Sequence, residues 1–393
     1  MNEVQQLTEL EAAMERRTAA LPERIRPFTR ERSALPRALL LVGPRGTGKT
    51  TFLLHHAKNS RLLYFSADNP TLAGTALYET VKTIFQAGYK GVIIDEVHFA
   101  RDWSRHVKAL YDEFPRHGIW ISDSSALVLR DGVGDLSRRF VRINMPLLSF
   151  REFLFLETGS EYPVFDAFSG GKKLPVAPDA DILAAFRRYR ECGTRPFYAE
   201  GDFKDRLLAV LEKSLYFDIP FFLPQITDGN LRLMKAIVGT LAGSAIPRLQ
   251  VRSLCTDWGI GAEKLYQIVN VMESVGILSV IRAEHETKAQ SVGAKLFFSD
   301  PALYPVLAGN PGTAREALVA CLCAASGWTV EASRDERAGD FVLTRATGGK
   351  RKKVTIEIGG TTKSRKEADF VIRDDLDYPA ARAIPLWLLG MGY

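Results

Sequence analysis

The chain has 393 residues, of which 46% are hydrophobic and 25% are charged, a balance typical of soluble globular proteins. Its length predicts about two to four domains, and a net charge of +6 is compatible with nucleic-acid contact without establishing it. Without a long apolar run or a CxxC pair, we expect no signal peptide, no membrane span and reduced thiols, as in a cytoplasmic protein.

Residues 1–30 are polar and predict an N-terminal helical segment, with apolar side chains at helical spacing. From there to residue 150, continuous apolar strands alternate with helices. The strands are expected within 37–42, 61–69, 91–98 and 118–129, and the helices after the loop at 43–48 and over 76–88. Apolar strands of this kind predict an α/β domain, 31–150, built on a buried parallel sheet.

The first strand runs into a glycine-rich loop and then a helix, in the pattern G-x-x-x-x-G-K-[ST]. Glycines let successive backbone N–H groups point at one phosphate, and the helix N-terminus adds partial positive charge. We expect Lys49 to reach the β- and γ-phosphates of ATP and the Thr50 hydroxyl to hold its Mg²⁺. A turn without a ligand is the alternative. The predicted nucleotide-binding residues are Gly43, Pro44, Arg45, Gly46, Thr47, Gly48, Lys49, Thr50 and Thr51.

Two acids end the strand at 91–98. Ligands bind at the carboxyl edge of such sheets, so Asp95 is predicted to hold Mg²⁺ through water, and Glu96 to polarise the attacking water. A polar strand end is the alternative for both. His98 either senses the site or caps the strand.

At this point the sequence resembles a known group. The segments "IIDEVHFARDW", "ISDSSALVL", "DLSRRF" and "LLSFREFL" occur in this order. They are similar to motifs of the prokaryotic AAA+-type P-loop ATPases that are often fused to a winged helix and a C-terminal restriction-endonuclease-like (PD-(D/E)XK-type) module. The resemblance covers almost the whole chain and is strongest from about residue 38 to 156. It implies a helical lid at 151–230 and an active site completed between subunits, hence a homo-oligomer.

The resemblance also assigns residues. Ser124 or Ser125 matches the position that senses the γ-phosphate, while Asp123 stands where the family usually has glycine. Arg138 and Arg139 match a pair that points at nucleotide, a role suited to the guanidinium group. Whether an arginine acts within its own subunit or on a neighbour is left open.

Structural ion pairs, to Asp135 or Glu152, are the alternative for these two arginines. In the predicted lid, Arg195 is a further candidate nucleotide sensor.

Residues 231–305 predict three helices and a two-stranded hairpin, the pattern of a winged helix. The helix at 261–275 carries fewer basic residues than helices that read DNA usually do, although Arg282, Lys288 and Lys295 lie in or near the wing. DNA binding, protein interaction and packing between domains therefore all remain open.

Residues 306–393 predict one helix and several strands, the last over "IPLWLLG" at 384–390. Glu316 on the helix, Asp340 opening a strand and Glu357 on the next follow the order of a nuclease core, in which acids bind Mg²⁺. The lysine expected two residues after Glu357 is missing, because Gly359 stands there.

The nearest substitutes for the missing lysine are Lys352, Lys353 and Lys363. Gly359 weighs against cleavage, so a degenerate module that binds nucleic acid or a subunit, an intact nuclease and an unrelated α/β domain stay open. The basic run at 350–353 predicts either a nucleic-acid-binding surface or a solvated turn.

Taken together, the sequence predicts an ATPase that uses ATP and Mg²⁺ to drive or gate the winged helix and the C-terminal module. The alternatives are an ATP-dependent switch with negligible turnover and an ATP-regulated DNA nuclease. Expected partners are ATP, DNA and further copies of the chain, with no membrane.

Overall fold

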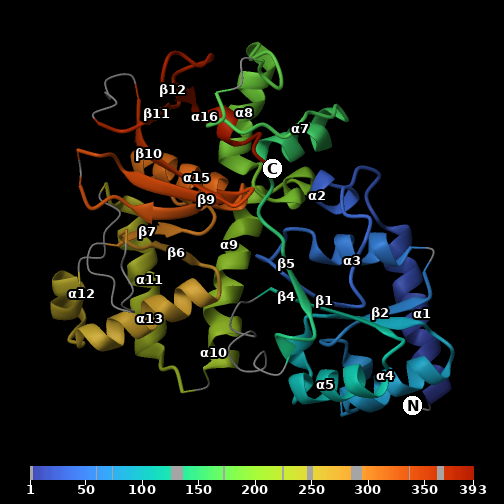
Figure 1. Cartoon of the computed structure of the whole chain (residues 1–393). Helices are drawn as coiled ribbons and strands as arrows, with labels where there is room; N and C mark the ends of the chain where they lie inside the picture. The colour runs from blue at the N-terminus through green and yellow to red at the C-terminus, as the bar shows by residue number, and fades with distance from the viewer. Residues whose placement is uncertain are drawn as a thin grey trace. The chain divides into compact units, whose positions relative to one another are not determined.

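The computed structural model describes residues 3–58, 60–72, 74–124, 136–170, 173–223, 225–245, 251–284, 294–335, 337–360 and 367–393. The chain divides into two compact units (Figure 1), Met1–Pro146 and Leu147–Tyr393, called the N-terminal and the C-terminal unit below. The predicted division of 151–393 into a lid, a winged helix and a third module stays a prediction. Within the described ranges, no helix is long and apolar enough to cross a membrane.

The N-terminal unit is built on a five-stranded sheet in the order β2-β3-β4-β1-β5, in which every neighbouring pair is parallel. All residues of β1 and β3 are buried, which explains their continuous apolar sequence. The strands are β1 (Ala38–Val42), β2 (Leu62–Ser66), β3 (Gly91–Asp95), β4 (Gly118–Asp123) and β5 (Val141–Asn144). The predicted parallel sheet is confirmed.

Two helices precede β1, and others lie between the strands. They are α1 (Glu3–Ala19), α2 (Pro27–Arg30), α3 (Lys49–Ala57), α4 (Leu77–Gln86) and α5 (Trp103–Glu113), with single 3₁₀ turns at Pro70–Leu72 and Val97–Phe99. Helix α1 packs against β2 and α3. The core of the unit joins side chains of α3, such as Phe52 and Leu53, to Leu39, Tyr64 and Ile93 of the sheet.

The C-terminal unit begins with helices. These are α7 (Phe150–Thr158), α8 (Ala180–Cys192), α9 (Phe203–Lys213) and α10 (Ile219–Phe222), with a 3₁₀ turn at Pro196–Glu200 and a π-helical turn at Ser214–Asp218. Next come α11 (Asp228–Gly243), α12 (Val251–Trp258), α13 (Ala262–Ser274) and the antiparallel pair β6 (Leu278–Ile281) and β7 (Lys295–Phe298). These elements follow the order predicted for 231–305.

A second five-stranded sheet completes the unit, in the order β12-β11-β10-β9-β8. Its strands are β8 (Thr329–Ala332), β9 (Phe341–Thr347), β10 (Lys350–Gly359), β11 (Phe370–Arg373) and β12 (Ala383–Pro385). Helices α14 (Leu303–Val306) and α15 (Pro311–Ala325) precede it, and α16 (Leu386–Leu389) follows it.

The prediction of a strand over 384–390 was partly wrong. Only its first two residues belong to β12, and Leu386–Leu389 form a helical turn whose side chains are all buried. A short apolar run buried on all sides has no periodicity that separates strand from helix.

Candidate functional site

The glycine-rich loop joins β1 to α3 and takes a backbone conformation that its glycines permit. Gly46 and Gly48 lie in the left-handed region, with φ of 75° and 96°. A Cβ atom on Gly43 would collide with the carbonyl oxygen of Met145, so the chain just after β5 approaches the loop too closely for any other residue. The loop thus has the tight curl that a phosphate-binding turn requires.

Lys49 is held inside this loop. Its Nζ donates to the carbonyl oxygens of Gly43, at 2.8 Å, and Pro44, at 3.2 Å. The residue is 6% exposed, and burial lowers the pKa of its ammonium group, against the opposing effect of nearby acids led by Glu96. Phosphate oxygens are stronger acceptors than these carbonyls, so a bound phosphate can draw the ammonium toward itself.

Asp95 lies at the end of β3 and is 4% exposed. The hydroxyl of Thr50 donates to its Oδ2 at 2.6 Å, and the phenol of Tyr64 donates to the same oxygen at 2.8 Å. Its Oδ1 accepts from the Ser122 hydroxyl and, at 3.2 Å, from the backbone N–H of Glu96. The sequence predicted that Thr50 and Asp95 act together, and the structure brings them into contact; Tyr64 and Ser122 were missed.

Mg²⁺ prefers oxygen ligands, and the Thr50 hydroxyl, which follows the phosphate loop, contacts the carboxylate of Asp95. The residues present therefore fit the Mg²⁺ of a bound nucleotide.

Glu96 has a backbone that non-glycine residues seldom adopt, with φ of 48°. Ser124 donates a hydrogen bond of 3.1 Å to its Oε2, and the Arg45 guanidinium lies 3.6 Å from its Oε1. Burial raises the pKa of this carboxyl, partly offset by Lys49 and Arg45. A strained, partly buried acid held by a loop arginine fits a functional role better than a structural one.

His98 lies at the same edge of the sheet, 6% exposed. Its Nδ1 is 2.7 Å from Oδ2 of the fully buried Asp123 and 3.7 Å from Oε2 of Glu96. In the described part of the chain, these three residues form the one group whose possible metal-ligand atoms all lie within 4.8 Å.

Two ligands of one zinc ion, each about 2.0–2.1 Å from the metal, lie about 3 Å or more apart. The separation of 2.7 Å is instead that of a hydrogen bond between His98 and Asp123. Asp123 thus supplies the carboxylate that holds His98 beside Glu96.

Arg138 and Arg139, which were predicted to point at nucleotide, lie in different surroundings. Arg139 makes a two-pronged ion pair with Asp112 of α5, with N–O distances of 2.9 and 3.0 Å, and Arg138 is exposed. Of the alternative partners, Asp135 lies outside the described residues, as does Ser125, and Glu152 closes a capping box with Ser149 at the start of α7.

Arg195, the further candidate nucleotide sensor, forms a buried ion pair with Asp300 inside the C-terminal unit, at 2.6 Å. Both side chains are almost fully buried, so this pair has the features of a structural contact.

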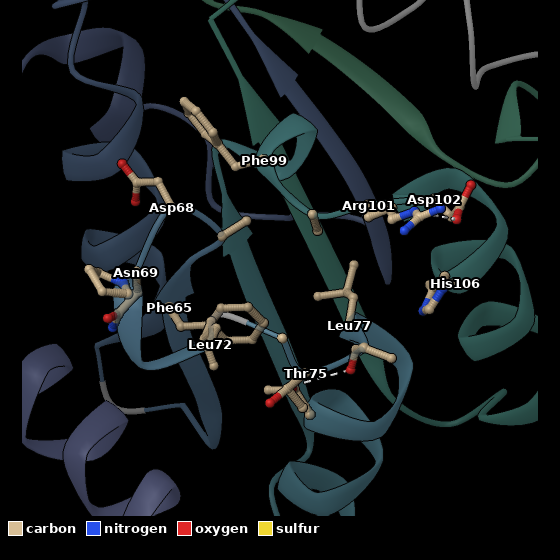
Figure 2. Close-up of a pocket in the computed structure, with 16 residues that line it drawn as sticks. Phe65, Asp68, Asn69, Leu72, Thr75, Leu77, Phe99, Arg101, Asp102 and His106 are labelled. Carbon is tan, nitrogen blue, oxygen red and sulfur yellow. Dashed lines mark hydrogen bonds and ion pairs between the residues drawn. The ribbon is translucent and has the colours of Figure 1, made fainter. Parts of the chain in front are cut away.

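A cavity of about 740 Å³ opens at the carboxyl ends of β2 and β3, and no sequence pattern had pointed to it. Figure 2 shows Phe65, Leu72 and Leu77 on its apolar side and Phe99 at the opposite end. Polar side chains complete the lining: Asp68, Asn69, Thr75, Thr80, Arg101, Asp102 and His106. Because Phe99 follows Glu96 by one 3₁₀ turn, the cavity and the acids at the end of β3 share one short segment.

The predicted nuclease-like acids lie in the C-terminal unit. Lys295 of β7 donates to Oε2 of Glu316 at 2.8 Å and to Oδ1 of Asp340 at 3.1 Å. The other oxygen of Asp340 accepts the backbone N–H of Ile358 at 2.9 Å, and Glu357 on β10 is fully buried. In the described ranges these three acids are not a group with ligand atoms within 4.8 Å.

The expectation about the missing lysine was therefore wrong in part. Lys352 donates to the carbonyl of Phe168 at 2.8 Å, and Lys353 pairs with Glu284. Lys363 lies outside the described residues. The lysine that reaches these acids is Lys295, which the sequence placed only in the wing, because no short-range pattern links it to Asp340.

The parallel sheet and the glycine-rich loop are consistent with a P-loop NTPase fold. Residues 35–154, which contain the loop, Asp95 and Glu96, match a family described as "AAA domain", a family of P-loop ATPases. No curated protein matches the chain.

Among solved structures, the Walker-type ATPase PABY2304 of Pyrococcus abyssi is similar over 69% of this chain and 91% of its own, with 13% identity and a TM-score of 0.42. A structure of RuvB from Thermotoga maritima is similar over 72% and 90%, with 16% identity and a TM-score of 0.32. The STAND protein PH0952 from Pyrococcus horikoshii, which has a tetratricopeptide repeat sensor, is similar over 72% and 42%, with 11% identity and a TM-score of 0.28. These likenesses place no functional residue.

Proposed function

We propose that the N-terminal unit binds ATP with Mg²⁺ and hydrolyses it at the edge formed by the phosphate loop, Asp95 and Glu96. The contact of 2.6 Å between Thr50 and Asp95 carries the proposal. It joins the first residues of α3 to the end of β3, where a nucleotide, its metal ion and an attacking water would meet.

The loop would bind the phosphates. Its curled backbone presents N–H groups, and Lys49 exchanges two neutral carbonyl acceptors for charged phosphate oxygens. The Thr50 hydroxyl and Asp95 would hold Mg²⁺, Asp95 through water, and the ion would neutralise phosphate charge. Side chains of the protein would then orient the attacking water and accept its proton.

Glu96 is the group proposed to accept that proton. Ser124 and Arg45 hold its two oxygens, so the carboxylate is kept from free rotation. Burial raises its pKa, which makes it a stronger base than an exposed glutamate. For Arg138 and Arg139 we retain the proposed role of stabilising phosphoryl charge, within the subunit or on a neighbour.

Steady-state phosphate release tests the proposal against the second candidate, a switch that holds ATP without turning it over. The Arg45 guanidinium favours that candidate, because it lowers the pKa of Glu96 and so weakens this carboxylate as a base. We expect Mg²⁺-dependent turnover by the wild type and none by Lys49→Ala. Tight nucleotide binding by a wild type that releases no phosphate would establish the switch instead.

We also propose that 231–305 forms a winged helix that binds DNA or a protein partner under control of ATP. The order of α11, α12, α13, β6 and β7 supports this, and Lys264 and Gln267 of α13 are exposed. Particle mass of Glu96→Gln with ATP, with and without duplex DNA, tests the homo-oligomer and DNA binding together. A monomeric mass in both conditions would contradict both parts.

For 306–393 we propose a nuclease-like module that does not cleave. The ammonium of Lys295 between Glu316 and Asp340 supports this, because it occupies acceptors that a metal ion would need. Plasmid incubated with Mg²⁺ or Mn²⁺ should stay intact. Nicking by the wild type that is abolished in Asp340→Ala and Glu357→Ala would establish the nuclease instead.

A further inference from the structure

Asp95 receives a hydrogen bond from a residue outside every motif discussed so far. Tyr64 lies on β2, next to β3 in the sheet, and its hydroxyl donates to Oδ2 of Asp95 at 2.8 Å. This is the oxygen that also accepts from Thr50. Tyr64 is 2% exposed, so its side chain has little freedom to leave this position.

Helix α1 supplies a second step. Nη1 of Arg17, in the last turn of α1, donates to the hydroxyl oxygen of Tyr64 at 2.8 Å, and its guanidinium lies 5.4 Å from the ring centre. A guanidinium has donors only, so the phenol oxygen must accept from Arg17. The single phenol proton is then directed to Asp95, and the order of donors along the chain Arg17–Tyr64–Asp95 is fixed.

The alternative is that this chain of bonds only fastens α1 to the sheet. Two observations favour a role at the site. The bonds end on the predicted Mg²⁺ acid, and they share an oxygen with the predicted Mg²⁺ hydroxyl. A second tyrosine offers the comparison, since Tyr89, which lies between α4 and β3, donates to Glu11 of α1 at 2.6 Å.

We propose that Tyr64 and Arg17 are positioning residues for the Mg²⁺ of the bound nucleotide. They fix the Asp95 carboxylate in the orientation that lets it accept from Thr50 and from metal-bound water. The inference rests on the proposed nucleotide site but not on hydrolysis. In this proposal α1 contributes to the metal site in addition to packing against the sheet.

Binding of a fluorescent ATP analogue, measured in EDTA and in Mg²⁺, tests this for Tyr64→Phe and the matched control Tyr89→Phe. Each substitution removes one tyrosine–carboxylate hydrogen bond and keeps the ring. Tyr89 is bonded to α1 through Glu11, and Tyr64 through Arg17. For Tyr64→Phe we expect unchanged affinity for the ATP analogue in EDTA. The factor by which Mg²⁺ raises that affinity should fall about tenfold. Tyr89→Phe should keep the full gain. Arg17→Lys should keep most of it, and Arg17→Met should lose it.

Equal effects of the two Phe substitutions would show that only the attachment of α1 matters and would overturn the proposal. An unchanged or larger Mg²⁺ gain in Tyr64→Phe would overturn it as well. A wild type that gains affinity from Mg²⁺ but never hydrolyses ATP would contradict only the ATPase, because the comparison of variants still decides the inference. A wild type without any Mg²⁺ gain would contradict both.

Discussion

Two predicted sets of metal-binding residues, the first being Thr50 and Asp95 in the N-terminal unit and the second Glu316, Asp340 and Glu357 in the C-terminal unit, differ in the charge of the groups that donate to their acids. In the N-terminal unit, Asp95 receives hydroxyl groups and a backbone N–H, all neutral donors. In the C-terminal unit, the ammonium of Lys295 forms ion pairs with both Glu316 and Asp340. Neutral donors leave the negative charge of the acid for a cation, whereas an ammonium neutralises it.

The comparison teaches that acids in the order of a metal site do not make one by themselves. What decides is the charge of their partners, and those partners come from other elements of the fold. We therefore expect divalent metal ions to act at the first set, together with nucleotide, and not at the second.

The largest expected effect separates the two lysines. Lys49→Ala should weaken nucleotide binding at least about 100-fold, because the phosphates lose their charged partner. Lys295→Ala should bind nucleotide as the wild type does, since its contacts are with Glu316 and Asp340. Calorimetric titration with an ATP analogue measures both, and equal losses in the two variants would break the comparison.

The two aspartates should separate next. Asp95→Asn should lose about tenfold or more of the affinity that Mg²⁺ adds to nucleotide binding, because an amide is a poor acceptor for metal-bound water. Asp340→Asn should keep the full Mg²⁺ effect. The same titrations in EDTA give the baseline, and a Mg²⁺ effect in Asp95→Asn equal to that of the wild type contradicts the assignment.

Removing the ammonium should expose the second set of acids. Lys295→Met should lower the free energy of unfolding by about 2 kcal/mol, because two mostly buried carboxylates lose their cation. Mn²⁺ should raise the melting temperature of this variant and leave that of the wild type unchanged. Lys353→Met, which removes a more exposed pair with Glu284, is the control and should cost within about 0.5 kcal/mol. A wild type stabilised by Mn²⁺ as much as the variant would refute this account.

The smallest expected effect is that of Glu96 on the stability of the nucleotide-free protein. Its pKa is raised in the folded protein, so folding favours the protonated form and stability is lost as pH rises through that pKa. Glu96→Gln cannot ionise and should therefore be more stable than the wild type at neutral pH, within about 1 kcal/mol. The difference should vanish at acid pH, where both states of the wild type are protonated. Thermal melts across pH check this, and a stability difference independent of pH would contradict it.

The parts of the site that could be predicted are those encoded in contiguous residues. The loop from Gly43 to Thr50 has fixed spacing, and the two acids at the end of β3 are adjacent. The apolar runs beside them fit only buried strands of a parallel sheet. Tyr64, Arg17 and Lys295 could not be found in this way. Their partners are far along the chain, and only the sheet order and the packing of α1 and β7 bring them together.

The short helix at Leu386–Leu389 escaped prediction for another reason, because an apolar run buried on every side shows no period. The same continuous apolar character correctly marked β1 and β3, where alternation with helices resolved the ambiguity.

A single-turnover experiment with ATP and Mg²⁺ tests the central claim most directly. Wild-type protein and Glu96→Gln are each loaded with radiolabelled ATP to equal occupancy, and released phosphate is followed over time. We predict release by the wild type and at least about a 100-fold slower release by Glu96→Gln, the usual effect of removing a general base. Equal rates of phosphate release in the two proteins would contradict the role of Glu96 and with it the proposed site of hydrolysis.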